Sequence, residues 1–149
     1  GTLFIRRGSG DSNLIGQQIG RHLQQGHNLL IFPEGTTTDG LAVRTFHGRL
    51  LSAAIEAQVP TQPVAVAYRY AGERDSTAPF INDDEFSQHL WRLLGSKDIE
   101  VDVRFLPLLD STRLNRNQLA RSAHASVCQA LGLEDGRVED ETAEVKAAA

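Results

Sequence analysis

Apolar and polar residues alternate along the chain in segments of two kinds. Short, mostly apolar runs are typical of β-strands, and segments with apolar residues three or four positions apart are typical of amphipathic helices. Strands are predicted at residues 2–5, 28–32, 63–68 and 99–105. Helices are predicted from the cap at Asp11 and Ser12 to Gly26, near residues 46–57, from residue 83 or 84 to 94, and at residues 115–131.

The order of these elements predicts an α/β fold. Strand, helix and strand alternate through the first half, which implies right-handed crossovers and a mostly parallel sheet flanked by helices. Apolar and charged residues alternate at 99–105, so this strand has one polar face and is expected near a sheet edge. We expect one domain at residues 1–133. Residues 134–149 have almost no apolar side chains that can pack, which predicts an acidic, disordered tail.

Composition and charge narrow the possible classes of protein. A chain of 149 residues with 40% hydrophobic content can bury one core. The formal charge of −4 lies in the tail, so residues 1–133 are neutral and offer no broad basic surface for nucleic acid. Cys128 is the single cysteine, which excludes an internal disulfide and fits a reducing compartment. No apolar run is long enough to span a bilayer, and no signal segment is visible.

One stretch combines a predicted strand end with polar chemistry. The apolar run at 29–32 leads directly into Pro33, Glu34, Gly35 and three threonines, which is typical of a buried strand that opens into a loop. Ligands often bind at the carboxyl ends of strands in open α/β sheets. Gly35 allows main-chain N–H groups to approach an anion, and Glu34 can position a donor. The alternative is an ordinary strand followed by a threonine-rich helix cap.

Three segments together resemble the glycerolipid acyltransferases, in particular the lysophosphatidate (1-acylglycerol-3-phosphate) acyltransferases. They are residues 1–7, the block Phe32-Pro33-Glu34-Gly35-Thr36, and residues 59–64, and they occur in the order and approximate spacing of three of the four family blocks. The resemblance covers about residues 1–70. It implies that Arg7 binds the phosphate of the acyl acceptor, because a guanidinium can grip two phosphate oxygens.

The same resemblance extends the acceptor site to the loop. It implies that Glu34, Gly35, Thr36 and Thr37 belong to this site, and that Pro60 and Pro63 are structural or face the acyl donor. Two positions depart from the family: Arg6 stands where an acid is usual, and Thr37 stands where an arginine is frequent. Both changes alter the charge around the predicted anion, so the acceptor head group stays open.

The catalytic base of the family is absent from this chain. The base is a histidine with an aspartate five positions later, and it takes the proton from the acceptor hydroxyl. The five histidines here are followed at that distance by histidine, phenylalanine, serine, leucine and glutamine. The family places this motif ahead of the block matched by residues 1–7. We interpret the chain as the carboxyl-terminal portion of an incomplete acyltransferase domain, with no catalytic residue of its own. His47, Arg44 and Arg49 follow the loop and are candidates for lining the acceptor site, although capping or surface roles are the alternative for His47.

The resemblance implies a phospholipid-synthesis enzyme that moves an acyl group from acyl-CoA or acyl-carrier protein to a lysophospholipid hydroxyl, without metal or cofactor. We expect the fragment to be inactive alone. The implied location is the cytoplasmic side of the membrane, either peripheral or anchored by residues outside this chain. Two alternatives remain: a non-catalytic module that binds or senses lipid phosphate, and an unrelated nucleotide-using α/β transferase. Against the latter, the chain lacks both glycine-rich nucleotide motifs.

Overall fold

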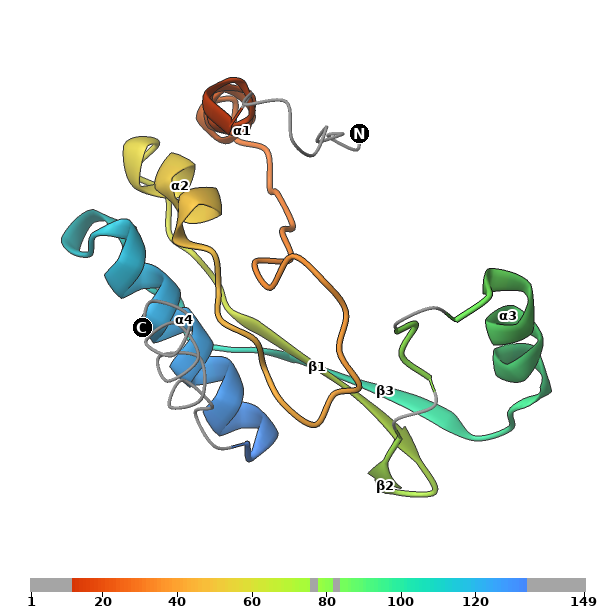
Figure 1. The fold of residues 1–149 in the computed structure, drawn as a ribbon. Helices are drawn as coiled ribbons and strands as arrows, with labels where there is room; N and C mark the ends of the chain where they lie inside the picture. Colours follow the sequence, from red (N-terminus) through yellow and green to blue (C-terminus); the bar gives the residue numbers. More distant parts are fainter. Residues whose placement is uncertain (1–11, 76–77, 82–83, 134–149) are drawn as a thin grey trace, which may run out of the picture.

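A computed structural model describes residues 12–75, 78–81 and 84–133 of the chain. The predicted strand at 2–5, Arg6, Arg7 and the predicted tail lie outside these residues. Figure 1 shows α1, α2 and α4 toward one end of the β1–β3 pair and α3 at the other end. In chain order the elements are α1 (Ser12–Gln24), the 3-10 helix η1 (Gly48–Leu51), α2 (Ser52–Glu56), β1 (Val64–Tyr70), β2 (Glu73–Arg74), α3 (Phe86–Gly95), β3 (Ile99–Phe105), the 3-10 helix η2 (Ser111–Arg113) and α4 (Arg116–Leu131).

The four predicted helices are confirmed, although the second is shorter and begins as the 3-10 helix η1. For α4, the residues at its two ends explain why the local sequence was sufficient to predict where the helix begins and ends. The Asn115 side chain accepts hydrogen bonds from the main-chain N–H groups of Asn117 and Gln118. The Gln118 side chain accepts one from the main-chain N–H of Asn115, which completes a capping box. The helix ends at Gly132, whose φ of 65° is the left-handed conformation that glycine adopts without strain.

The predicted parallel sheet is wrong. The described residues form a three-stranded sheet in the order β2-β1-β3, and both pairs are antiparallel. The strands predicted at 63–68 and 99–105 are confirmed as β1 and β3, and β3 lies at a sheet edge as expected. They pair directly with each other along their full length. The alternation of strands and helices predicted parallel strands joined by crossovers. The direction of pairing instead depends on which strands lie side by side, and here β1 lies beside β3.

The strand predicted at residues 28–32 is also wrong. These residues have no regular structure, and Leu30 and Phe32 are each 74% exposed. Ile31 alone of this run packs against a buried cluster. An apolar run becomes a strand only when a neighbouring strand pairs with its N–H and C=O groups. Within the described residues β1 pairs with β3 and β2, and no strand pairs with residues 28–32.

The buried core lies under α4 in two adjoining clusters. Leu119 is fully buried and packs with Leu51 and Ala120, with Phe46 and Ile31 among the partly buried residues around them. The second cluster joins the carboxyl-terminal half of α4 to β1 and to the loop before η1. Its buried members are Val43, Ala65, Val127 and Cys128. The helix α4 therefore fixes the position of that loop relative to the sheet.

The alternation at 99–105 predicted the polar face of β3, but not that this face of the β1–β3 pair would meet α4. Ala65, Ala67 and Arg69 lie opposite Arg104, Asp102 and Glu100, and this mixed face meets α4 through Ala65 and Arg104. The other face is apolar along both strands. Five of its residues are largely exposed: Val66, Tyr70, Val101, Val103 and Phe105. The strand's charged residues thus face α4, whereas its apolar residues face outward.

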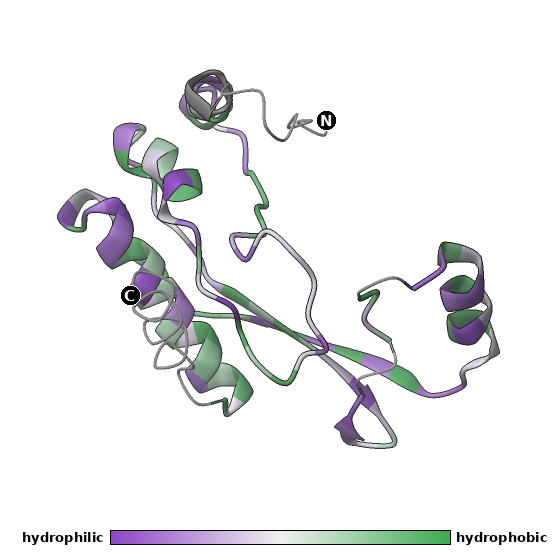
Figure 2. Ribbon diagram, viewed as in Figure 1, coloured by the Kyte–Doolittle hydropathy of each residue, from purple (hydrophilic) through white to green (hydrophobic). Residues whose placement is uncertain are grey.

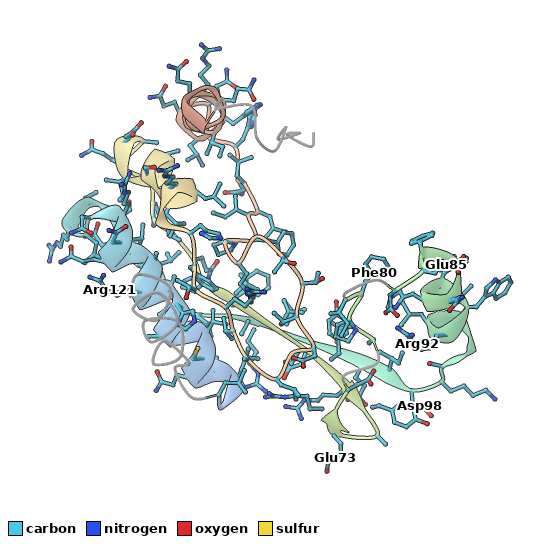
Figure 3. The ribbon with its side chains drawn as sticks, viewed as in Figure 1. Glu73, Phe80, Glu85, Arg92, Asp98 and Arg121 are labelled. Carbon is cyan, nitrogen blue, oxygen red and sulfur yellow. The ribbon has the colours of Figure 1, made fainter. Side chains whose placement is uncertain are left out.

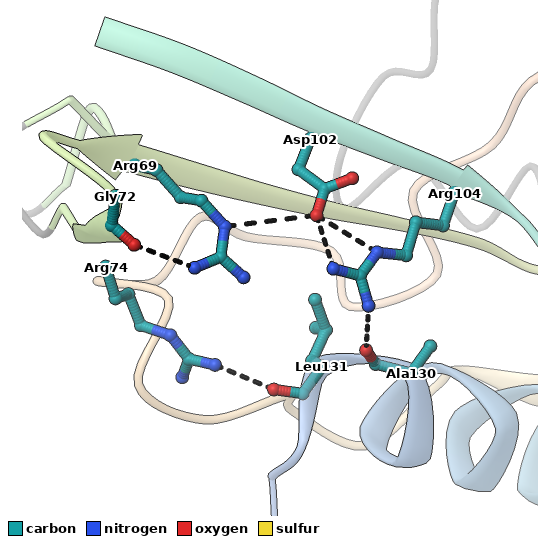
Figure 4. A network of polar contacts seen from close by, with 7 residues as sticks. All are labelled: Arg69, Gly72, Arg74, Asp102, Arg104, Ala130 and Leu131. Carbon is teal, nitrogen blue, oxygen red and sulfur yellow. Dashed lines mark hydrogen bonds and ion pairs between the residues drawn. The ribbon is translucent and has the colours of Figure 1, made fainter.

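A polar network joins the charged face of the sheet to the carboxyl end of α4 (Figure 4). Arg104 donates to Asp102 through Nε at 3.0 Å and Nη2 at 2.5 Å, and its Nη1 donates to the Ala130 carbonyl at 2.8 Å. Arg69 approaches the same carboxylate, with Nε 3.9 Å from Oδ2. Arg74 donates to the Leu131 carbonyl at 2.8 Å. These cations satisfy carbonyls that the helix end leaves open and suit its negative dipole.

This network predicts an acid-dependent contribution to stability. The hydrogen bond from Arg104 lowers the pKa of Asp102 from its ordinary 3.8. The Asp102 contribution is therefore complete above pH 3.8 and is lost as the pH falls through the lower pKa of the folded state. We expect Asp102→Asn to be less stable than the wild type at neutral pH, with the difference narrowing as the pH falls. Urea denaturation of both proteins between pH 3 and 7 measures this, and a gap that widens on acidification would contradict it.

Candidate functional site

The loop that follows residues 28–32 folds back on itself and holds two segments side by side. The main-chain N–H of His47 donates to the Pro33 carbonyl at 2.9 Å. The main-chain N–H of Arg44 donates to Oε2 of Glu34 at 3.0 Å. The half-buried Glu34 carboxylate, which the sequence predicted to position a donor, thus accepts from the main chain of Arg44. This hydrogen bond closes the loop formed by residues 34–44.

Gly35 lies against the ring of His47 in the second segment. Its φ is +72°, and its N–H donates to the Phe32 carbonyl at 3.2 Å. A Cβ placed on Gly35 would lie 3.3 Å from Cδ2 and 3.4 Å from Nε2 of the His47 ring. Both the backbone conformation and this close approach therefore require a glycine. The sequence predicted that main-chain N–H groups at Gly35 can approach an anion, and this stays a prediction, because the N–H of Gly35 itself donates to Phe32.

The three threonines of the loop have different surroundings. Thr37 Oγ1 donates to the Phe80 carbonyl at 2.5 Å, which ties the loop to the segment before α3. Thr38 Oγ1 donates to the Ala42 carbonyl at 3.3 Å, so this hydroxyl also serves the loop itself. Thr36 is exposed, and its hydroxyl makes no hydrogen bond within the part of the chain that the structure describes. Of the three hydroxyls, that of Thr36 is the one left for a ligand.

His47 was a candidate for lining the acceptor site, with a capping or surface role as the alternative. It occupies the N-cap position of η1, but its side chain makes no capping hydrogen bond. Its exposed ring lies instead against Gly35, beside the predicted acceptor-binding residues. Arg44 is exposed on the same loop, and Arg49 is exposed on η1. The signal in the sequence was the position of His47 directly after the loop, at the start of the next helix.

A hollow of about 230 Å³ lies beside the loop, between it and α4. Its lining is Thr45, Phe46, Asn117, Ala120, Arg121 and His124. The His124 ring packs edge-on against Phe46 with centroids 5.2 Å apart, and its Nε2 lies 3.1 Å from the Val43 carbonyl. Arg121, labelled in Figure 3, is exposed on α4. The buried His124 imidazole therefore packs beneath the loop at Val43 and Phe46. Arg121 places a cation at the hollow.

The two prolines of residues 59–64, Pro60 and Pro63, have different surroundings. Pro63 is buried at the start of the sheet, and its carbonyl accepts a hydrogen bond from Leu106 N at 3.0 Å. Pro60 is exposed and lines a second hollow of about 210 Å³ with Leu108 and Leu109. Pro63 thus has a structural place, and the donor-facing role stays a prediction for Pro60.

The structure also contains a histidine–aspartate pair in the reverse order along the chain. His89 Nδ1 lies 3.6 Å from Oδ2 of Asp84, and Arg92 Nη2 lies 2.8 Å from the same oxygen. His89 is only 6% exposed, and its ring packs edge-on against Phe80 with centroids 5.1 Å apart. The ring is thus buried away from an acceptor hydroxyl, and Arg92, which donates to both Asp84 and His89, joins α3 to the segment before it.

Two further features bear on the class of site. Arg7, the predicted phosphate ligand, lies outside the described residues. Among residues 12–75, 78–81 and 84–133, no group of three or more histidine, cysteine or acidic side chains is arranged to hold a metal ion. Within the same residues, none of the helices has both the length and the apolar content that crossing a bilayer requires.

Comparisons with known proteins agree with the blocks in the sequence. The family model described as Acyltransferase matches residues 1–67. The lyso-ornithine lipid O-acyltransferase of Pseudomonas aeruginosa is 54% identical over 88% of this chain and 51% of its own length. The enzyme of the same name from Rhodobacter capsulatus is 33% identical over 89% of this chain and 50% of its own length.

A relative with another acceptor in its name also matches. The 1-acyl-sn-glycerol-3-phosphate acyltransferase of Neisseria gonorrhoeae is 31% identical over 74% of this chain and 44% of its own length. No solved structure matches. The chain spans about half the length of these curated relatives. The family match over residues 1–67 and the similarity to these acyltransferases along most of the chain show that this protein belongs to the glycerolipid acyltransferase family.

Proposed function

We propose that the complete protein transfers an acyl group from the thioester of coenzyme A or acyl-carrier protein to the hydroxyl of a lyso-ornithine lipid. The observation that carries this proposal is the 54% identity to the Pseudomonas aeruginosa enzyme over 88% of the chain. The acceptor oxygen forms the new ester bond to the acyl carbon, the thioester bond breaks, and the hydroxyl proton passes to a base while the thiol leaves. The reaction requires no metal and no cofactor besides the acyl donor.

Within the loop, Thr37 supports an acceptor with less negative charge than lysophosphatidate, whereas Arg6 in place of an acid changes the charge in the opposite direction. Thr37 stands where the family frequently has an arginine, and its hydroxyl is used in the 2.5 Å hydrogen bond to Phe80. The site therefore has one cation fewer at that position. An ornithine head group offers a carboxylate and a basic amine instead of a phosphate. Arg7 can grip a carboxylate as it grips a phosphate, because both present two oxygens to the guanidinium fork.

We assign the remaining acceptor contacts to the loop. The Thr36 hydroxyl is the exposed polar group of the loop that we assign to the acceptor, and Gly35 leaves space beside it because it has no Cβ. Glu34 keeps the loop closed through Arg44 N. His47 lines the same site through its contact with Gly35. In this proposal the described residues recognise the acceptor, and they do not perform the proton transfer.

We further propose that the general base comes from a part of the protein outside these 149 residues. No histidine in the chain has the family spacing to an aspartate, and the relatives are about twice as long. The apolar face of the β1–β3 pair supports this, because Val66, Val101, Val103 and Phe105 are between 43% and 72% exposed. A face of this kind is usually covered by another layer of a domain. The fragment alone is then inactive, and the complete enzyme works at the cytoplasmic membrane surface.

An acylation assay tests this function. The 149-residue chain and the longer natural protein are each incubated with acyl-CoA or acyl-carrier protein, and with lyso-ornithine lipid or lysophosphatidate. We expect turnover by the longer protein with lyso-ornithine lipid as the better acceptor, and none by the short chain. Turnover by the short chain would disprove the missing base. Lipid binding by the longer protein without turnover would favour the non-catalytic lipid-binding module instead.

A further inference from the structure

The helix α3 presents an apolar side to solvent. Phe86, Leu90 and Leu94 recur every fourth residue, so they lie along one side of the helix, and Trp91 extends that side. Phe86, Trp91 and Leu94 are 69%, 73% and 67% exposed, and Leu90 is 40% exposed. Figure 2 shows that strongly hydrophobic and strongly hydrophilic residues share this short helix. Four large apolar side chains on one side of a helix form an exposed patch, and patches of this kind usually mark an interaction site.

The opposite side of α3 packs against the rest of the protein, and this packing leaves the apolar side exposed to solvent. His89 is buried against Phe80, and Arg92 donates to Oδ2 of Asp84 at 2.8 Å and to Nδ1 of His89 at 2.7 Å. Figure 3 shows Arg92 on the side of α3 that faces the segment carrying Phe80. Rotating the helix to hide its apolar side would break these contacts. The patch is thus a fixed feature of the fold.

The helix is also connected to the acceptor loop. Thr37 Oγ1 donates to the main-chain carbonyl of Phe80 at 2.5 Å. The Phe80 ring in turn packs against Phe86 and His89 of α3, with centroids 6.5 Å and 5.1 Å apart. One residue therefore touches both the predicted acceptor site and the helix with the apolar side. Whatever α3 binds is held close to the loop that receives the acceptor.

We propose that α3 is the membrane-docking element of this protein and lies in the plane of the lipid surface with Phe86, Leu90, Trp91 and Leu94 among the upper acyl chains. The inference rests on the proposed function, because a lysolipid acceptor resides in a membrane. Tryptophan and phenylalanine on one side of an amphipathic helix, with polar residues behind them, suit the interface between head groups and acyl chains. Docking by α3 brings the Thr37 loop to the level of the acceptor head groups.

The charges around α3 indicate which membrane it requires. Asp84, Glu85 and Asp98 oppose Arg92 and Lys97, so the region is slightly acidic. Attraction to anionic lipid therefore contributes little, and apolar contact provides the binding energy. We expect docking on zwitterionic phosphatidylcholine vesicles and little loss of binding in high salt. Binding that appears only with anionic lipid and disappears in salt would contradict docking by this patch.

Trp91 is the only tryptophan in the chain, so its fluorescence reports on α3 directly. We expect phosphatidylcholine vesicles to shift the Trp91 emission to shorter wavelength, and vesicles with brominated acyl chains to quench it. The double variant Phe86→Ser/Leu94→Ser keeps Trp91 as the reporter. It should weaken vesicle binding by about tenfold or more, because two apolar side chains that would enter the membrane are lost. Phe105→Ser is the matched control. Its side chain is 72% exposed on the sheet and away from α3, so its loss should weaken binding much less than the double substitution does.

Several outcomes would overturn the proposal. Unquenched Trp91 on brominated vesicles, or an equal loss of binding in Phe105→Ser, would exclude α3 as the docking element. A blue shift that grows with protein concentration without lipid would show that a second copy covers the patch. Shielding of Trp91 from acrylamide in the longer natural protein without lipid would show that another segment covers it. Trp91 depth in this chain and turnover by the longer natural protein are separate readouts, so insertion of Trp91 combined with no acyl transfer by the longer protein would reject the proposed function and support docking.

Discussion

Replacing Leu119 with alanine is expected to lower the free energy of unfolding by about 2 to 5 kcal/mol, because the side chain is fully buried and its loss leaves a cavity. Leu119 lies where α4 meets η1, packed with Leu51 and Ala120 and next to Phe46. Small domains are typically stable by only about 5 to 15 kcal/mol, so this loss is a large fraction of the total. Urea denaturation followed by circular dichroism measures it.

Leu108→Ala provides the control for this prediction. Leu108 is 61% exposed, and exposed substitutions away from special features usually change stability by about 0.5 kcal/mol or less. The same truncation at the two positions therefore separates burial from side-chain identity. Equal losses in both variants would show that the α4 cluster is not the main source of stability.

The second large effect is expected at Gly35, through the predicted acceptor site. Gly35→Ala places a Cβ at a φ of +72°, which costs about 1 to 2 kcal/mol for a residue other than glycine. The same Cβ would lie 3.3 Å from the His47 ring and push it away from the loop. We therefore expect lower stability together with a loss of acceptor use in the longer enzyme. Denaturation and acceptor kinetics measure the two effects separately.

Gly40→Ala separates the two causes at Gly35. Gly40 has a φ of +78°, but a Cβ there would meet nothing within 4 Å. It should reproduce the backbone cost and leave acceptor use nearly unchanged. In Gly35→Ala/His47→Ala the contact with the ring is removed, so part of the stability lost in Gly35→Ala should return. Identical behaviour of Gly35→Ala and Gly40→Ala would show that the approach of His47 to Gly35 has no importance.

The loop of the candidate site could be located from the sequence, but the contacts of its residues could not. The block from Phe32 to Thr36 identified the loop, and the positive φ of Gly35 agrees with the freedom expected of that glycine. Glu34 binds the main chain of Arg44, and Thr37 binds the Phe80 carbonyl 43 residues away. Sequence proximity contains no information on such partners, because they depend on how the loop folds back. The contact between His47 and Gly35 was missed for the same reason.

What the sequence by itself determined is local and chemical. The helices follow from apolar spacing and caps such as Asn115, the strands β1 and β3 follow from β-favouring runs, and the family follows from the blocks near Arg7, Glu34 and Pro60. Each of these depends on neighbours within a few positions.

Only the tertiary structure decided how the elements meet. It replaced the expected parallel sheet with an antiparallel one and left residues 28–32 without a strand partner. It turned the charged face of β3 toward α4 and left the apolar sides of the β1–β3 pair and of α3 exposed. The physical reason is that an apolar pattern records a preference for burial, whereas hydrogen-bond partners and covering surfaces come from distant segments.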